Sequence, residues 1–295
     1  MSKTDFYTEI RNNNFKTYLL LFFFFIFVIL IAIALKYIFS FSGFGILFFA
    51  GVLAIIYALV GYYKGDKIVL STSRAKPADE QQFMHLHNVV EGLAIAAGIP
   101  KPKVYVINDD SPNAFATGRD PDHASVVVTT GLLKTLNREE LEGVIGHELS
   151  HIRNRDIRVM TIVTVLFGLI SMASDIALRS LLWGGGNNDN NNNSIMLIVA
   201  IVFVVLAPIV AMMIQMAISR KREFLADASS AQLTRYPQGL ANALKKISQT
   251  SKPVAAATKG TAHMYIANPL RGKQFSKLFD THPPIQERIS KLESM

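Results

Sequence analysis

Long apolar stretches restrict the fold of this chain more than any other feature. Residues 17–35 read TYLLLFFFFIFVILIAIAL, close to the roughly 20 apolar residues with which a helix crosses a bilayer core of about 30 Å. Three further apolar stretches follow along the chain. We predict a mainly helical membrane protein with four transmembrane helices, at about 17–37, 39–63, 159–182 and 195–218.

Two of these stretches have alternative interpretations. The first resembles a signal peptide, but its apolar run exceeds the usual length of about 7 to 15 residues, and a second apolar run follows at once, which favours a membrane helix. The third is interrupted by Asp175 and Arg179 and is also compatible with a long buried helix of a soluble domain. These two charges lie four residues apart, so on a helix they would share one face and pair.

Lysine and arginine residues set the predicted orientation, because short loops rich in them stay in the cytoplasm. They gather on the side shared by residues 1–16, 64–156 and 220–295. We therefore expect both chain ends on the cytoplasmic side, where 64–156 and 220–295 fold together as one domain. Residues 17–63 and 157–219 would form the two membrane hairpins.

The two polar segments predict a domain of helices with a small β-sheet. Apolar residues at helical spacing mark a helix over 79–98, and β-branched residues mark strands over 103–108 and 125–130. We expect the two strands to form a hairpin or a meander beside the helices. Residues 250–281 show little periodicity and are predicted to form a loop.

Capping residues indicate two more helices. Asn137 is followed three residues later by Glu140, the spacing of a capping box, so a helix should begin at Asn137. Pro283 and Pro284 favour the first turn of a last helix, which should end near Ser294.

Charge and cysteine content exclude several classes of site. The formal net charge is +8, but the basic residues form no tract of five or more and no nucleic-acid-binding motif is present, so we expect no nucleic-acid partner. The chain has no cysteine, which excludes disulfides, thiolate metal sites and cysteine nucleophiles. Any metal must therefore be bound by nitrogen and oxygen.

The stretch HELSH at 147–151 lies on the helix that begins at Asn137. Histidines four residues apart project from one face of a helix, so His147 and His151 can both reach one ion at about 2.0–2.1 Å. Glu148 lies beside them and is placed to accept a proton from a water activated by the metal. A chance match is the alternative, since such a pattern arises in on the order of one in a hundred chains of this length.

A third ligand is available in the stretch REFLAD at 222–227. Glu223 completes a His/His/Glu set with the fourth position open, as in catalytic rather than structural zinc sites. Asp227, one helical turn later, would accept the other ring N–H of a ligating histidine; the alternative is a surface carboxylate paired with a basic neighbour. Zinc, one ion per chain, fits these ligands best, with cobalt and manganese as alternatives. Such a site predicts peptide hydrolysis with Glu148 as the general base.

Several motifs together give the chain a wider resemblance. They are HELSH followed by Arg153, Asn154 and Asp156, NAFATG at 113–118, REFLAD at 222–227 and THPPIQERI at 281–289. Over nearly its whole length the chain resembles the HtpX family of bacterial membrane zinc endopeptidases, relatives of the CAAX-prenyl and Oma-type proteases. The resemblance implies a zincin-like α+β catalytic domain with His147, His151 and Glu223 as zinc ligands.

The resemblance also implies roles outside the metal ligands. Asn113, Ala114 and Phe115 would belong to a substrate-binding edge to which a peptide adds as an extended strand. His282 and Arg288 would hold substrate or the oxyanion. Misfolded or damaged membrane proteins would be cut at the cytoplasmic face of the bacterial inner membrane, as part of a stress response. From the residues alone, Asn113 would be a turn former and Arg288 a charge on a helix surface.

A non-catalytic membrane protein is the competing interpretation. It would be a transporter with Asp175 and Arg179 in its path, or a scaffold with a structural metal site. A transporter should have polar faces in several spans, whereas the first two predicted spans have almost none. This scarcity favours the zinc endopeptidase, whose partners would be polypeptides and membrane lipid. The sequence leaves the oligomeric state open.

Overall fold

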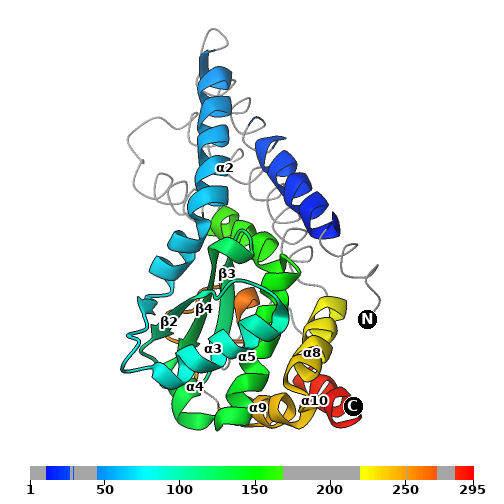
Figure 1. Cartoon of the computed structure of the whole chain (residues 1–295). Helices are drawn as coiled ribbons and strands as arrows, with labels where there is room; N and C mark the ends of the chain where they lie inside the picture. The colour runs from blue at the N-terminus through cyan, green and yellow to red at the C-terminus, as the bar shows by residue number, and fades with distance from the viewer. Residues whose placement is uncertain (1–10, 27–28, 30–44, 169–219, 251, 271–282) are drawn as a thin grey trace, which may run out of the picture.

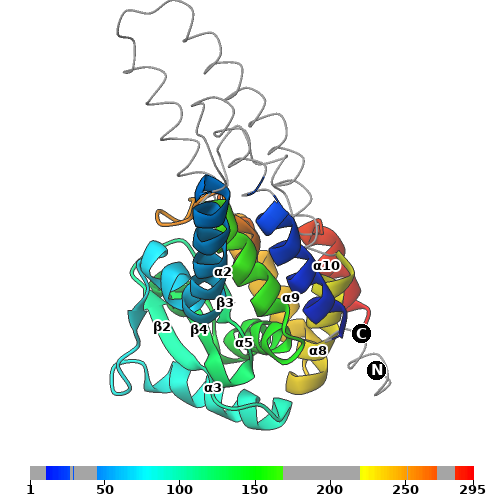
Figure 2. The ribbon, with the colours of Figure 1, turned by 90° about the horizontal axis from the view of Figure 1, so that it is seen from above.

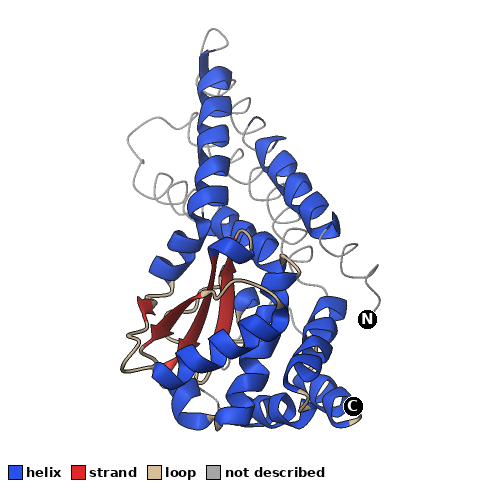
Figure 3. Cartoon of the chain, in the orientation of Figure 1, coloured by secondary structure: helices blue, strands red, loops and turns tan. Residues whose placement is uncertain are grey.

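The computed structural model of the chain describes residues 11–26, 29, 45–168, 220–250, 252–270 and 283–295 (Figure 1). This part is mainly helical, with one small sheet (Figure 3). The helices are α2 (Gly45–Thr72), α3 (Met84–Ala97), α4 (Thr130–Thr135), α5 (Arg138–Arg153), α8 (Arg220–Thr234), α9 (Pro237–Gln249) and α10 (Ile285–Glu293). Residues 11–26 and 156–168 are also helical. The strands are β1 (Lys76–Pro77), β2 (Lys103–Ile107), β3 (Ala114–Gly118) and β4 (Ala124–Thr129), and 3₁₀ turns cover Pro121–His123 and Ala262–Met264.

The sheet has the strand order β1-β2-β4-β3, with β2 and β4 as parallel neighbours. The strands predicted at 103–108 and 125–130 are thus confirmed, but the hairpin or meander predicted for them is wrong. The connection between them contains a further strand, β3, which pairs antiparallel with β4. Because the chain reverses direction before and after β3, β4 runs the same way as β2.

Both faces of the sheet are buried, as is usual where strands run parallel. Val104, Val126 and Val128 belong to an apolar cluster with residues of α3 and α5 on one face. Phe115 and Val127 alternate with residues of that face along the strands and belong to a second cluster, with the end of α2 and apolar residues from the loop after α9. α5 therefore lies in a helical layer against the sheet, where it also contacts α8 and α9.

The predicted four-span membrane fold is not what the structure shows. Within the described ranges, no helix is both long and apolar enough to cross a membrane. Most apolar residues at 157–166 are buried in the protein itself, and α2 continues without a break into a charged end with Lys64, Asp66 and Lys67. The mainly helical fold with a small sheet is confirmed, and the four spans are corrected. The stretch predicted at 195–218 and parts of the other three lie outside the described residues.

Two glycines bring α2 close to the helix at 156–168. A Cβ atom on Gly65 would lie 2.8 Å from Thr161 Cγ2, and one on Gly61 would lie 3.3 Å from Val165 Cγ1. Larger side chains would force the two helices apart, because such distances are at or below the limit of van der Waals contact. The close packing fixes the position of 156–168, which follows directly on the end of α5.

Candidate metal centre

α5 carries the HELSH stretch into the interior of the protein. Its capping box is formed as predicted: Asn137 accepts a 2.9 Å hydrogen bond from the Glu140 amide, and Glu140 accepts one of 2.9 Å from the Asn137 amide. The later turns lie between the sheet and the helices α8 and α9. As a result His147, Glu148 and His151 are at most 4% exposed.

The Nε2 atoms of His147 and His151 point to the same place. They are 3.2 Å apart, and the two rings are nearly perpendicular, at 85°. Two nitrogen ligands about 2.05 Å from a tetrahedral ion would lie about 3.4 Å apart. The two imidazoles therefore have the spacing of ligands to one ion.

Glu223, on α8, completes the cluster. Its Oε1 lies 3.6 Å from His151 Nε2, and its Oε2 lies 3.7 Å from His147 Nε2. One ligand atom from each of the three residues lies within 4.8 Å of the others. The three predicted ligands form a possible metal site, and this set of two nitrogens and a carboxylate suits zinc.

Small residues allow α8 to approach α5. A Cβ atom on Gly146 would lie 2.9 Å from Ser230 Oγ. That hydroxyl is fixed, because it donates a 2.6 Å hydrogen bond to the Gly143 carbonyl. The distance between Glu223 and the two histidines thus depends on the absence of a side chain at Gly146.

A carboxylate stands behind each histidine. Asp227 Oδ1 lies 2.9 Å from His147 Nδ1, and Asp156 Oδ2 lies 2.9 Å from His151 Nδ1. Each carboxylate can accept the Nδ1–H, which directs the Nε2 lone pair toward a metal. Asp227 lies behind a histidine, as the sequence suggested, whereas sequence reasoning gave Asp156 no role.

The turn after α5 brings Asp156 back to His151. Arg155 has a left-handed φ of 59°, which is uncommon for a residue other than glycine and reverses the chain directly after the helix. Asn13 Nδ2 donates to Asp156 Oδ1 over 2.7 Å, and Arg222 Nη1 donates to the same atom over 3.2 Å. The sequence marked Asp156 only by its place in the motif that follows HELSH, five residues after His151, and assigned it no contact.

Arg288, on α10, is buried beside the cluster. Its Nη2 and Nε donate hydrogen bonds of 2.7 and 2.9 Å to the two oxygens of Asp227, and its Nη1 donates one of 2.9 Å to the Ile266 carbonyl. Nη1 is also 3.6 Å from Glu223 Oε2. Burial raises the pKa of Asp227, but the Arg288 charge and a histidine hydrogen bond hold it well below its usual range. His282, predicted for a similar role, lies outside the described residues.

The start of the predicted substrate-binding edge is covered by the chain itself. Asn113, Ala114 and Phe115 all contact the segment 265–267. Asn113 Nδ2 donates a 3.0 Å hydrogen bond to the Ala267 carbonyl, and Ala114 and Phe115 pair with the segment through the backbone. These three residues are buried, at no more than 3% exposure.

Glu148 lies between β3 and the possible metal ligands. The Ala116 amide of β3 forms a hydrogen bond with its carboxyl group. Its Oε2 is buried and has no hydrogen-bond partner among the residues that the structure describes. Burial, together with the nearby charge of Glu223, raises the pKa of Glu148 to about 7. A carboxyl group with this pKa can both accept and donate a proton near neutral pH.

The two histidines differ in their affinity for protons. Burial lowers the pKa of His147 to about 4, so this imidazole is neutral at pH 7. Burial also disfavours the charged form of His151, but its hydrogen bond to Asp156 and the charge of Glu223 raise its pKa to about 9. Because a metal ligand must be deprotonated, a metal ion would have to displace a proton from His151.

Comparison with known families agrees with this centre. Residues 80–295, most of the chain, match peptidase family M48. The chain belongs to peptidase family M48. The family match makes it a metalloprotease, which is the enzyme class that the sequence predicted.

Full-length relatives of this M48 peptidase carry the name Protease HtpX homolog. The one from Caldanaerobacter subterraneus subsp. tengcongensis is 47% identical and covers 100% of this chain and 99% of the relative. The one from Thermoanaerobacter pseudethanolicus is 46% identical, with the same coverage of 100% and 99%. The predicted resemblance to the HtpX family is thereby confirmed. The crystal structure of S. mikatae Ste24p aligns with 82% of this chain and 57% of its own, at a TM-score of 0.49 and 20% identity.

Proposed function

We propose that this M48 peptidase is a zinc-dependent endopeptidase in which His147, His151 and Glu223 hold the ion and Glu148 moves the protons. One observation carries the proposal. The buried Glu148 carboxyl adjoins the three possible ligands without belonging to their set, and its Oε2 has no hydrogen-bond partner among the described residues. A structural metal site would not require such a group.

The ion and the residues around it have separate roles in peptide hydrolysis. Zinc, when bound, supplies a Lewis acid that polarises the scissile carbonyl and lowers the pKa of a water molecule. Glu148 Oε2 accepts a proton from the attacking water and then delivers it to the nitrogen of the leaving amine. The Ala116 amide keeps the carboxyl group oriented through both transfers. No covalent bond between substrate and protein forms.

We propose that an extended polypeptide binds beside β3 at Ala116, between the contact of Phe115 with Tyr265 and the hydrogen bond of the Gly118 amide to Thr161. Support comes from Ala116, whose backbone reaches Glu148 directly. A peptide paired with this edge strand would pass the general base with its own backbone extended. Misfolded or damaged membrane proteins, cut under stress, are the substrates that we propose.

We further propose that the protein works at the cytoplasmic face of a bacterial inner membrane. A row of large apolar side chains on α2 supports a membrane location, because contiguous exposed apolar surface of this kind marks contact with lipid or protein. Each of these side chains is at least 51% exposed: Phe48, Phe49, Leu53, Ile55, Ile56 and Leu59. Flotation of the purified protein with phosphatidylcholine vesicles tests the location, and a chain that stays at the bottom of the gradient contradicts it.

Glu148→Gln tests the catalytic proposal. The amide cannot accept the proton of water, so cleavage of a denatured, fluorescently labelled protein should slow by about 10²–10⁴-fold. Metal analysis of the same preparation should still find one zinc per chain. Glu139→Gln, an exposed glutamate in the first turn of the same helix, serves as the matched control and should keep full activity.

The two interpretations of the site differ in their outcomes. If Glu148→Gln cleaves as fast as the wild type, Glu148 is not the general base. If wild type and Glu148→Gln both bind zinc and neither cleaves, a structural metal site in a non-catalytic protein is favoured instead.

A further inference from the structure

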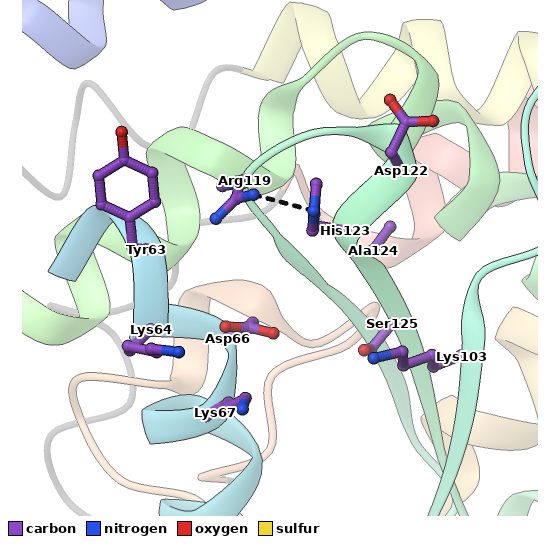
Figure 4. A pocket seen from close by; sticks show the side chains of 10 residues that line it. All are labelled: Tyr63, Lys64, Asp66, Lys67, Lys103, Arg119, Asp122, His123, Ala124 and Ser125. Carbon is purple, nitrogen blue, oxygen red and sulfur yellow. Dashed lines mark hydrogen bonds between the residues drawn. The ribbon is translucent and has the colours of Figure 1, made fainter. Parts of the chain in front are cut away.

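A basic pocket of about 320 Å³ opens beside the charged end of α2 and shares no lining residue with the metal centre. α2 forms one wall, and the sheet with the turn between β3 and β4 forms the other (Figure 4). Its basic side chains are Lys64, Lys67, Lys103, Arg119 and His123. Sites for small molecules typically have volumes of about 300–1,000 Å³, so the basic pocket can hold a ligand of modest size.

Three of these cations are available to a ligand. Lys64, Lys67 and Lys103 are exposed, and none of them forms an ion pair with another described residue. Arg119 differs, because its Nε donates a 3.2 Å hydrogen bond to Asp120 Oδ2. Three ammonium groups around one opening raise the local concentration of anions.

Two carboxylates also line the pocket, and they limit which anions it favours. Figure 4 shows the Asp122 side chain turned away from the other groups, while Asp66 lies near Lys64 and Lys67 on α2. Asp66 therefore opposes part of the lysine charge. A ligand with a compact, permanent negative charge, such as a phosphate ester, overcomes this better than a weakly charged one.

An apolar groove of about 220 Å³ adjoins the basic pocket. It lies between the helix at 11–26 and α2, which Figure 1 shows side by side and which the rings of Phe24 and Tyr57 join; Figure 2 shows the helix at 156–168 beside both. Phe25, Ala58 and Leu59 are among the residues that line it. Tyr63 lines both the groove and the pocket, and the Arg119 guanidinium lies over its ring, 5.1 Å from the centroid. One aromatic ring thus separates a charged compartment from an apolar one, as tyrosines do at membrane interfaces.

We propose that the basic pocket and the apolar groove together bind one anionic phospholipid. Its phosphate lies among Lys64, Lys67 and Lys103, and one acyl chain lies in the groove past Tyr63. A free phosphate would use the pocket alone, whereas a phospholipid matches both compartments and their order along α2. The inference rests on the proposed membrane location and is independent of the proposed catalysis.

Calorimetric titration of the purified full-length protein with soluble short-chain lipids tests the proposal. Dihexanoyl phosphatidylglycerol should bind more tightly than dihexanoyl phosphatidylcholine and more tightly than glycerol 3-phosphate, which has no acyl chain. Lys64→Gln/Lys67→Gln should weaken phosphatidylglycerol binding by about 25-fold, since each lysine near an anionic head group contributes roughly a factor of five. Lys101→Gln/Lys134→Gln removes two exposed lysines elsewhere and should leave the affinity unchanged.

Two substitutions test the apolar groove separately from the basic pocket. Ala58→Trp fills it and Leu59→Gln makes it polar at an exposed position, so both should weaken phosphatidylglycerol binding while glycerol 3-phosphate binds as before. If phosphatidylglycerol binds the groove variants as tightly as it binds the wild type, the groove holds no acyl chain, the site takes free phosphate and the lipid assignment is overturned. If Lys64→Gln/Lys67→Gln binds the lipid as tightly as the wild type, the basic pocket does not bind the phosphate. If the protein floats with neutral vesicles and shows no preference for anionic lipid, the proposed membrane location stands and the proposed phospholipid site is overturned.

Discussion

Asp156 holds His151 through one hydrogen bond and is itself held by Asn13 and Arg222. This arrangement fixes the imidazole from behind, at the nitrogen that faces away from the possible metal. The contribution of such a carboxylate is to ligand basicity and ring orientation, so its loss should appear in metal affinity before it appears in the fold.

Asp156→Asn should lower zinc affinity by about 10–100-fold, because the amide keeps the shape of the side chain but loses its charge. Competition with a fluorescent chelator measures the change. Asp110→Asn, at an exposed aspartate whose side chain pairs with Lys134, is the control and should not alter the affinity. Equal zinc affinities in Asp156→Asn and wild type would show that the contact does not orient His151.

Zinc binding should release a proton. Since the pKa of His151 lies near 9 without metal, this imidazole is largely protonated at pH 7, and a ligand must be neutral. The group loses its proton on binding, so zinc affinity rises with pH and levels off above about 9. Titrations in buffers of different ionisation enthalpy count the protons; a count of zero at pH 7 would contradict the prediction.

At the scale of elements, the centre depends on how closely α5 and α8 pack. Gly146→Ala places a methyl group 2.9 Å from Ser230 Oγ and should destabilise the protein by about 1–3 kcal/mol while weakening zinc binding, because Glu223 moves with α8. Gly92→Ala is the matched control: this exposed glycine of α3 has nothing within 4 Å of the added methyl, so stability should rise by about 0.5–1 kcal/mol. Urea unfolding and chelator competition measure both. A stable Gly146→Ala protein with normal zinc affinity would mean that α8 tolerates the displacement.

Local signals in the sequence were sufficient to predict several helices and strands. α3 stops where Gly98 adopts a left-handed φ of 67°, and α5 begins at the capping box of Asn137. The strands β2 and β4 were predicted from their β-branched residues. β3 was missed, because its sequence AFATG lies among turn-forming residues and its strand conformation comes from pairing with β4.

Long apolar runs gave the least reliable prediction. Hydropathy alone does not distinguish a residue that faces lipid from one buried in protein, and at Val159, Ile162 and Val163 the partner is the protein itself. Within one helix, however, the spacing of His147 and His151 was enough to predict that one nitrogen of each ring reaches a common point, which the structure shows to be the two Nε2 atoms. Periodicity predicts which residues share one face of a helix or strand, but it does not predict whether protein or lipid covers that face.

At the scale of the whole molecule, the residues of the possible site come from segments far apart in the sequence. Asn13 and Asp156 are 143 residues apart, and Arg288 and Asp227 are 61 apart. No local pattern encodes such contacts, so Asp156 and Asn13 could not be assigned a role from sequence spacing. Arg288 was anticipated only through the family resemblance, and its contact with Asp227 emerged from the fold.

Removal of zinc should lower the stability of the entire protein, since the ion would join α5 to α8. Free zinc at about 1,000 times its dissociation constant stabilises the folded state by about 4 kcal/mol, which corresponds to a shift of roughly 7 °C for a chain of this size. Scanning fluorimetry with and without a chelator measures it. His147→Ala should melt at the same temperature in both conditions; a chelator effect of equal size in this variant would place the stabilising metal elsewhere.

The position of Arg288 in the chain also determines how late in synthesis its contact with Asp227 can form. The guanidinium neutralises Asp227, yet it lies 141 residues after His147 in the chain. At a translation rate of about 5–20 residues per second, on the order of ten seconds pass between the two residues. A nascent chain that already contains HELSH therefore still lacks the guanidinium that holds Asp227 in the finished fold, so we expect the centre to be completed only at the end of synthesis.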